Sequence, residues 1–253
     1  MREEKSGCTL CTYKYLRPHT TNLNTSTAIL FFSRTSVEEA CVKNWLPGKK
    51  KKNEFLAKRL IKQTLAEAKK TNLPIFIVDS AKQTGNSFGE KFSNAIESVF
   101  NQGIENVIAI GSDCPRLTAA DIQKAYNISS RGNIVLGPDT RGGVYLLGLN
   151  KNNFNPQLFQ QLPWQTSDLL KAFINYAVAA GATTTALRSL DDFHLTVTIS
   201  SACLLKKVLS FPLLKTVMAL FSSNFHTNLF SFSYSPFSGV YCKGLRAPPY
   251  CLF

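Results

Sequence analysis

Acidic residues are scarce in this chain, and none occurs after Asp192. The sequence has 29 lysines and arginines against 16 aspartates and glutamates, which gives a formal net charge of +13. This excess favours anionic partners, such as nucleotide diphosphates, anionic lipid or nucleic acid, and does not choose among them. The change in composition at Asp192 sets residues 193–253 apart as a basic, acid-free extension of uncertain order.

Long hydrophobic runs are also missing. No stretch approaches the ~20 apolar residues that a membrane-spanning helix needs, and Lys206, Lys207, Pro212 and Lys215 interrupt the apolar parts of the extension. The first thirty residues lack the continuous apolar segment of a secretory signal. We therefore expect a cytoplasmic protein without a transmembrane segment, although residues 193–253 could form a basic amphipathic segment on a membrane surface.

Paired metal-binding motifs are lacking as well. Cys8 and Cys11 are the only closely spaced cysteine pair, and the three histidines stand far apart. A structural zinc site normally needs four such ligands, so zinc is not expected. The seven cysteines are odd in number and spread along the chain. They fit reduced thiols better than a disulfide framework, in agreement with a cytoplasmic location.

The longest run of one charge is Lys49–Lys52, which follows Pro47 and Gly48. Runs of this kind are most often solvated loops. Neither interleaved aromatic residues nor a nucleic-acid-binding motif accompanies it. We expect no specific nucleic-acid partner, and attraction of a nucleotide diphosphate is the more economical functional interpretation.

Strand and helix patterns alternate through residues 27–192. Apolar runs predict strands at 28–32, 74–80, 107–110, 133–137, 144–149 and 183–187. Amphipathic patterns predict helices at 53–70, 88–100 and 119–128, a short one after Asn155, and one ending before Gly181. The predicted N-caps are Asn53, Thr118, and Thr166 or Ser167. The alternation predicts right-handed crossovers and a largely parallel sheet.

The segment from Val107 to Leu149 carries the strongest functional pattern. Its first strand leads directly into Asp113, and Pro115 forces the chain to turn away at once because proline cannot continue a strand ladder. In open α/β sheets, ligands bind at the carboxyl ends of the strands. Further along, Gly142 and Gly143 allow the backbone to approach a ligand closely. We therefore expect a ligand site built around Asp113.

The runs GSDCPRLT (111–118) and VLGPDTRGGVYLLGL (135–149) resemble the signature of a bacterial family of GT-A-like proteins. The family is known as domain of unknown function 2064 and includes glycosyltransferases of the arsenosugar-biosynthesis type. Residues 86–92 and 162–168 fit the same pattern. The resemblance implies an α/β fold of the GT-A or nucleotide-diphospho-sugar transferase type, a three-layer α/β/α domain with a mostly parallel sheet. It divides the chain into a polar basic arm (1–26), a transferase domain (27–192) and the extension (193–253).

The same resemblance implies metal-assisted transfer of a sugar from a nucleotide-sugar donor. Nucleotidyltransferases share the fold, so an enzyme acting on a small phosphorylated acceptor is an alternative. A non-catalytic nucleotide- or RNA-binding protein on the same fold is a second alternative. We expect a transferase whose partner is a nucleotide sugar or nucleotide. The donor, the acceptor and the oligomeric state stay open.

Site residues follow from the resemblance, position by position. Asp113 is the expected ligand of Mg²⁺ or Mn²⁺, because these cations prefer carboxylate oxygens and bridge phosphates. Catalytic candidates are Asp113, Asp139 and Arg141, with Asp191 and Asp192 as further possible bases or ligands. Candidates for binding nucleotide or substrate are Arg34, Lys43, Gly89, Glu90, Ser112, Gly142, Gly143 and Trp164.

Several of these candidates also have an ordinary structural explanation. Trp164 could stack on a substrate ring or seal a helix against the sheet, and Glu90 could simply complement the positive end of a helix. Arg141 stands where the family usually has an aspartate before the two glycines. Its planar guanidinium could clamp a phosphate or carboxylate, or it could mark a binding protein that has lost catalysis.

Overall fold

The computed structural model describes residues 14–16, 26–193 and 211–221. The strands are Lys14–Leu16 (β1), Thr27–Phe32 (β2), Ile75–Val78 (β3), Asn106–Ile110 (β4), Ile134–Pro138 (β5), Val144–Asn150 (β6) and Thr184–Ala186 (β7). The helices are Ser36–Lys43 (α1), Lys50–Lys69 (α2), Phe88–Phe100 (α3), Ala119–Ser129 (α4), Pro156–Gln160 (α5), Leu169–Ala179 (α6) and Phe211–Phe221 (α9), with a 3-10 turn at Lys151–Asn153 (η1). The predicted α/β alternation is confirmed.

One seven-stranded sheet forms the centre of the fold, in the order β1-β3-β2-β4-β6-β5-β7. β2 pairs in parallel with β3 and β4, and β5 pairs in parallel with β7. β6 is antiparallel to both β4 and β5, and β1 is antiparallel to β3. Five strands therefore point the same way, which confirms the mostly parallel sheet.

The position of β6 is the feature that the alternation did not predict. Only residues 139–143 join β5 to β6. A connection this short can form an antiparallel hairpin but not a parallel crossover, which needs a dozen or more residues. β6 therefore returns beside β5 and lies between β5 and β4. This arrangement brings the loop that contains Asp139 next to the end of β4.

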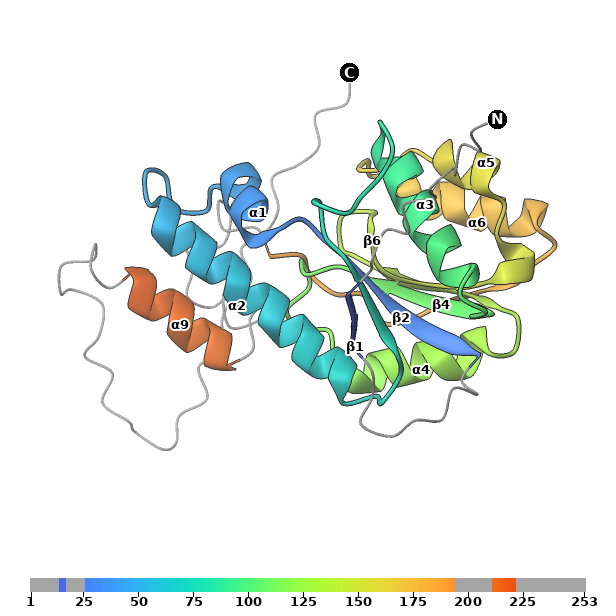
Figure 1. Ribbon diagram of the computed structural model, residues 1–253, viewed down its shortest axis with the longest axis horizontal. Coiled ribbons are helices and arrows are strands. Elements are labelled where there is room, and N and C mark those ends of the chain that lie inside the picture. The colour runs from blue at the N-terminus through green and yellow to red at the C-terminus, as the bar shows by residue number, and fades with distance from the viewer. Residues whose placement is uncertain (1–13, 17–25, 194–210, 222–253) are drawn as a thin grey trace, which may run out of the picture.

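Helices cover both faces of the sheet and complete the three predicted layers. On one face, α3, α5 and α6 pack through Ile96, Phe159 and Phe173. On the other face, α2 and α4 pack through Ala68 and Ile122. Figure 1 shows α3, α5 and α6 above the sheet and α4 below it. Each face of β2 and β4 is therefore covered, which explains their continuous apolar runs.

Parts of the predicted arm and extension pack against this domain. β1, from within residues 1–26, adds an edge strand to β3. α9, from within residues 193–253, lies alongside α2 (Figure 1), where Leu213 and Val217 are buried. The Cys8–Cys11 pair and most of the proposed membrane-surface segment lie outside the described residues. The two boundaries between these three parts stay a prediction.

Helix ends follow the local sequence at some sites and depart from it at others. Thr118 caps α4 in a full capping box with Asp121, as predicted. At α6 the N-cap residue is Asp168, and Thr166 instead accepts a hydrogen bond from the Asp168 backbone N–H (3.3 Å). The prediction that Thr166 or Ser167 is the N-cap is therefore wrong, because the helix begins after Asp168 and the Thr166 side chain stabilises the turn before it.

Asn53 also differs from its predicted role. α2 begins at Lys50, so Asn53 lies inside the helix and the lysine run forms its start instead of a loop. The buried Asn53 side chain accepts a hydrogen bond from the Leu46 N–H (2.8 Å) and donates one to the Leu46 C=O (2.9 Å). It thereby satisfies both backbone groups of Leu46 and fixes the turn between α1 and α2.

Within the described ranges, none of the helices combines the length and the apolar character that crossing a bilayer requires.

Replacing Asn53 should destabilise the fold although it touches no candidate site residue. In Asn53→Ala, the N–H of the buried Leu46 loses its partner, which costs about 1–3 kcal/mol, while the Leu46 C=O keeps its hydrogen bond from the Lys49 N–H (3.0 Å). Urea unfolding should show a midpoint below that of the wild type with an unchanged slope. Asn127→Ala, an exposed change within α4, is the matched control and should have little effect. Equal midpoints for the two variants would contradict this role of Asn53.

Candidate active site

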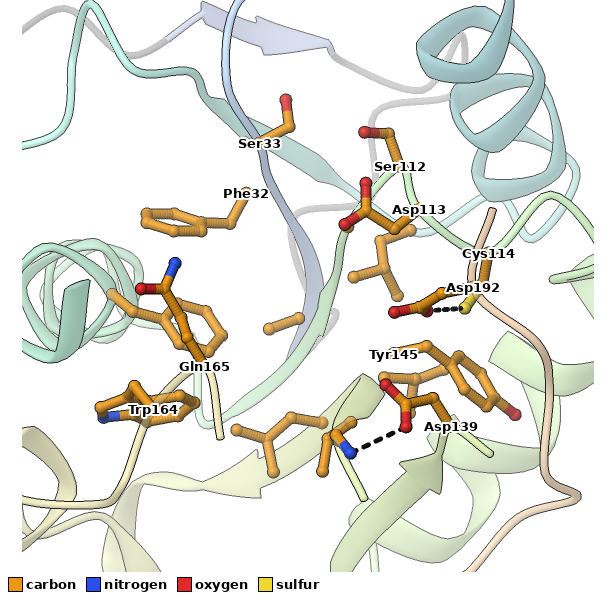
Figure 2. A pocket seen from close by; sticks show the side chains of 18 of the residues that line it. Phe32, Ser33, Ser112, Asp113, Cys114, Asp139, Tyr145, Trp164, Gln165 and Asp192 are labelled. Carbon is orange, nitrogen blue, oxygen red and sulfur yellow. Dashed lines mark hydrogen bonds between the residues drawn. The ribbon is translucent and has the colours of Figure 1, made fainter. Parts of the chain in front are cut away.

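A cavity of about 360 Å³ opens at the carboxyl ends of β2 and β4. Its lining comes from the ends of these strands, α1, α3, the β5–β6 loop, β6, α6 with the loop before it, and Asp192. Figure 2 shows Phe32, Trp164 and Gln165 on one side, facing Ser112, Asp113, Cys114 and Asp192 on the other. The cavity therefore has an aromatic wall and a carboxylate wall.

Asp113 reaches the cavity because β4 ends just before it. β4 is buried along its whole length, and the chain turns at Pro115 and Arg116, directly after the Asp113–Cys114 pair, as predicted. The Asp113 side chain is 44% exposed, so its carboxylate can meet a ligand. The backbone carbonyl of Asp113 accepts a hydrogen bond from the Phe193 N–H (2.8 Å), which anchors the turn.

Lys43 lies beside Asp113, and Arg34 pairs with the neighbouring Glu39. Lys43 Nζ is 3.3 Å from Asp113 Oδ2 and 4.0 Å from Glu39 Oε1. Arg34 donates to Glu39 Oε2 (3.0 Å). Burial raises the pKa of Glu39, the charge of Asp113 raises it further, and Lys43 and Arg34 partly oppose this. Arg34, Glu39 and Lys43 thus form a connected charged group at one end of the cavity.

Asp192 lies at the centre of a second charged group. Its Oδ1 accepts a hydrogen bond from the Cys114 thiol (2.9 Å), and its Oδ2 accepts one from the Arg141 guanidinium (3.1 Å). Burial raises the pKa of Asp192, and the charges of Asp113 and Asp139 act in the same direction. The three aspartates therefore interact electrostatically across the cavity, and Arg141 offsets part of their repulsion.

The β5–β6 loop presents Asp139 in a fixed orientation. Asp139 Oδ1 accepts hydrogen bonds from the backbone N–H groups of Arg141 (2.7 Å) and Gly143 (2.8 Å). A side chain at Gly143 would clash with the Asp139 carboxylate. Gly142 has a φ of 89° and faces the Ser167 backbone, where a Cβ would also clash. The two glycines are thus explained by the loop, and Gly142 does not line the cavity.

The aromatic wall has no charged member. Trp164 packs against Phe88, Phe92, Phe159 and Phe173, with ring centroids 4.8–5.5 Å away. Its indole N–H donates to the Phe159 C=O (2.9 Å). Trp164 seals α3 and α6 together, which confirms its structural interpretation, and it also lines the cavity. Its stacking on a substrate ring stays a prediction.

Gly89 and Glu90 lie at the start of α3, outside the cavity lining. A Cβ on Gly89 would clash with the Gln160 carbonyl and come within 2.8 Å of Trp164, so glycine permits close helix packing here. Glu90 completes the capping box of α3 with Ser87. These contacts give both residues a structural role, and their binding role stays a prediction. Asp191, which accepts a hydrogen bond from Thr140 Oγ1 (2.8 Å), is likewise outside the lining.

Several lining residues were missed by the sequence reasoning. Glu39 stands four residues before Lys43 on α1, a spacing that could have identified the pair. Gln165 has a φ of 64°, which is unusual for a residue with a Cβ. No sequence signal marks it. The phenylalanines of the aromatic wall follow helical spacing and are indistinguishable from core residues by pattern alone.

The carboxylate wall fits a divalent cation only in a particular way. In the described part of the chain, no group of three or more His, Cys, Asp or Glu side chains is arranged to hold a metal ion. Mg²⁺ is commonly held by one or two carboxylates together with substrate phosphates. The exposed carboxylate of Asp113, with Asp139 and Asp192 nearby, fits this shared arrangement, in which a ligand supplies the remaining oxygens.

Comparisons with known proteins agree with the fold and the site segments. Residues 56–166 match the model of a family described as an uncharacterised protein conserved in bacteria (DUF2064). A crystal structure from Desulfovibrio desulfuricans G20, provisionally described as a nucleotide-diphospho-sugar transferase, is 23% identical. The match covers 79% of this chain and 98% of that one, with a TM-score of 0.64. The predicted resemblance to DUF2064 and the predicted fold class are thereby confirmed, and the arsenosugar-type glycosyltransferase activity stays a prediction.

More distant matches add no argument about function. A cytidylyltransferase from Leptospira borgpetersenii serovar Hardjo-bovis (strain JB197) is 13% identical, with 82% and 100% of the two chains covered and a TM-score of 0.38. A glycosyltransferase involved in glycosylation of the major capsid of PBCV-1 is 11% identical, with 63% and 82% covered and a TM-score of 0.36. No curated protein matches the chain. The geometry of the cavity is therefore the basis for assigning a reaction.

The environment of Cys114 predicts an unreactive thiol. Burial raises its pKa well above the ordinary value, and the carboxylates of Asp192, Asp113 and Asp139 add to this effect. Because only the thiolate attacks alkylating reagents, Cys114 should react at least about tenfold more slowly than the exposed Cys41 at pH 8. Peptide mass spectrometry after timed iodoacetamide treatment measures both rates.

The contribution of Asp192 can be separated from that of burial. Asp192→Asn removes a negative charge, which lowers the pKa of Cys114 and raises its thiolate fraction at any fixed pH. The rate profile of Cys114 should therefore shift to lower pH. Asp191→Asn, the neighbouring change outside the cavity, should leave it unmoved. Identical profiles in both variants would contradict the electrostatic explanation.

Proposed function

We propose that this chain binds a nucleotide sugar in the cavity and transfers its glycosyl group with the help of a divalent cation. One observation carries the proposal: the exposed carboxylate of Asp113 lies just after the end of β4 and next to Lys43. It lines the same cavity as Asp139 and Asp192. Carboxylates held next to cations suit a ligand that brings both phosphates and a metal ion. The similarity to the Desulfovibrio protein supports the fold on which such a site would be built.

The diphosphate of the donor would lie near the group formed by Arg34, Glu39 and Lys43. Both cations are within reach of the cavity, since Arg34 and Lys43 line it. Arg34 is paired with Glu39, and Lys43 is paired with Asp113. A bound diphosphate would exchange these pairs for phosphate contacts, so binding would not require uncompensated buried cations.

Asp113 would hold the divalent cation, and donor phosphates would complete its coordination. The cation would supply charge neutralisation for the departing nucleotide diphosphate. Ser112 is buried next to Asp113 and lines the cavity, so we expect it to lie near the cation as well. Asp139 is held by two backbone N–H groups and would orient the ligand from the opposite loop.

Asp192 is the residue best placed to accept a proton from the acceptor hydroxyl. Its raised pKa makes the carboxylate a stronger base than an ordinary aspartate. Arg141 and Cys114 fix its two oxygens, which orients it toward the cavity. In this assignment Arg141 replaces the acidic residue of the family pattern and acts by holding the base in place.

One observation favours a second candidate, a nucleotide-binding protein without catalysis. The Asp192 carboxylate is paired with Arg141, and the Asp113 carboxylate is paired with Lys43. Such pairing can neutralise groups that a transferase needs. A nucleotidyltransferase acting on a small phosphorylated acceptor is a third possibility, and pyrophosphate release from a nucleoside triphosphate would identify it.

Donor binding is the first step to test. Full-length protein should unfold at a higher temperature with nucleotide sugars plus Mn²⁺, because a ligand at about a hundred times its Kd adds roughly 2.7 kcal/mol of stability. Differential scanning fluorimetry across several nucleotide sugars and nucleoside triphosphates, with and without Mn²⁺, measures the shift. Asp113→Asn should lose the metal-dependent part of it.

Asp168→Asn is the matched control, since Asp168 is exposed and lies outside the cavity. It should retain the full shift. If no donor shifts wild-type protein that circular dichroism shows to be folded, the donor-site proposal fails. If Asp113→Asn responds like the wild type, the metal assignment fails while nucleotide binding survives.

Arg141 separates the catalytic proposal from the binding-protein alternative. Arg141→Asp places a fourth aspartate beside Asp113, Asp139 and Asp192, which should loosen Asp192 and reduce turnover by about tenfold or more. Nucleotide release measured with saturating donor gives the rate. Arg131→Asp, an exposed change outside the cavity, makes the same charge difference and should be neutral. Turnover that appears only in Arg141→Asp would instead favour the non-catalytic account.

A further inference from the structure

The segment that follows β7 contributes Asp192 to the lining of the candidate site. Its backbone is hydrogen-bonded to β5, since Leu187 N–H donates to the Leu136 C=O (2.8 Å) and Leu190 N–H donates to the Pro138 C=O (3.1 Å). It is also bonded to the loop after β5, where Thr140 N–H donates to the Leu190 C=O (3.2 Å). At its far end, Phe193 N–H donates to the Asp113 C=O (2.8 Å). Asp192 is thus held between the β5–β6 loop and the turn that carries Asp113.

Phe193 is the last described residue of this segment and is almost fully buried, with 1% of its surface exposed. Its backbone N–H bonds to the Asp113 C=O and so joins the segment that carries Asp192 to the Asp113 turn. Its ring packs on Trp45, with the centroids 5.8 Å apart, and belongs to a cluster with Leu56 and Leu60 of α2. The Phe193 side chain therefore anchors the segments that carry Asp113 and Asp192 to α2 and to Trp45, which lies between α1 and α2.

α9 completes the cluster around Phe193. Leu213 and Val217 of α9 are 1% and 0% exposed within the same cluster, and α9 runs alongside α2 in Figure 1. The cluster also contains Ala40 of α1, the helix that carries Glu39 and Lys43. The apolar face of α9 therefore packs on α2 and completes the cluster that holds Phe193, to which α1 also contributes.

We propose that α9, acting through Phe193, positions Asp113 and Asp192 at the cavity. Phe193 is a positioning residue: it touches no cavity space itself and acts through the backbone of its two neighbours. The acid-free extension is then a working part of the site. The proposal rests on the proposed function only for the identity of the ligand, because the position of Asp192 can be measured without one.

Cys114 provides a ligand-free measurement of that position. Its thiol is buried and donates a hydrogen bond to Asp192, so release of the Asp192–Phe193 segment should expose it. Val217→Asp puts a charge at a fully buried position of α9, and Ala219→Asp puts the same charge at an exposed position of the same helix. In the full chain, Val217→Asp should raise the alkylation rate of Cys114 by about tenfold or more, whereas Ala219→Asp should not.

Amide hydrogen exchange of β4 distinguishes local release from general unfolding. β4 lies at the centre of the sheet, so its amides should stay protected in Val217→Asp while Cys114 becomes reactive. An unchanged Cys114 rate, or a rise that merely parallels exchange in β4, would overturn the proposal. If Val217→Asp does not fold, Leu213→Ala with Lys215→Ala as its exposed control replaces the pair.

Phe193 itself is tested by a large and a conservative change. Phe193→Ala should expose Cys114 as Val217→Asp does, and Phe193→Leu, which keeps an apolar anchor, should restore most of the protection. With a donor identified by the binding screen, Phe193→Ala should also weaken its metal-dependent binding about tenfold or more and Phe193→Leu should not. If the wild-type chain binds no donor, the proposed function fails, and the Cys114 rates still decide whether α9 positions Asp192.

Discussion

Four carboxylates line one cavity, and their mutual repulsion is the constraint on which the rest of the site depends. Glu39, Asp113, Asp139 and Asp192 each have a specific partner that offsets it. Arg34 and Lys43 pair with the first two, backbone N–H groups bind Asp139, and Arg141 with Cys114 binds Asp192. Arg141 is easily understood in this setting, because a fifth acid at its position would add to the repulsion instead of relieving it.

Much of the fold could be predicted from local pattern. The buried run before Asp113 gave β4, and the spacing of Phe92, Ile96 and Phe100 gave α3. The place of β6 could not be read from periodicity, since strand order depends on the short loop at 139–143. Asn53 was misjudged because its partners on Leu46 lie seven residues back, beyond the reach of a capping rule.

The candidate site could be predicted in part for a similar reason. Asp113 and Arg34 each follow a predicted strand, which places both at the carboxyl edge of the sheet, and both line the cavity. Helix starts are ambiguous, because glycine and glutamate at the beginning of α3 suit packing and capping as well as ligand binding. Gln165 and the aromatic wall depend on how the loop before α6 folds over the sheet, which no spacing in the sequence records.

The facing walls of the cavity also constrain the thermodynamics of any occupant. A ligand that fills the cavity must remove the aromatic wall around Phe88 and Trp164 from water while it keeps polar groups toward Asp113 and Asp192. Withdrawal of apolar surface from water lowers the heat capacity. Binding here therefore becomes more exothermic as the temperature rises, even when most of the hydrogen bonds that select the ligand lie on the carboxylate side.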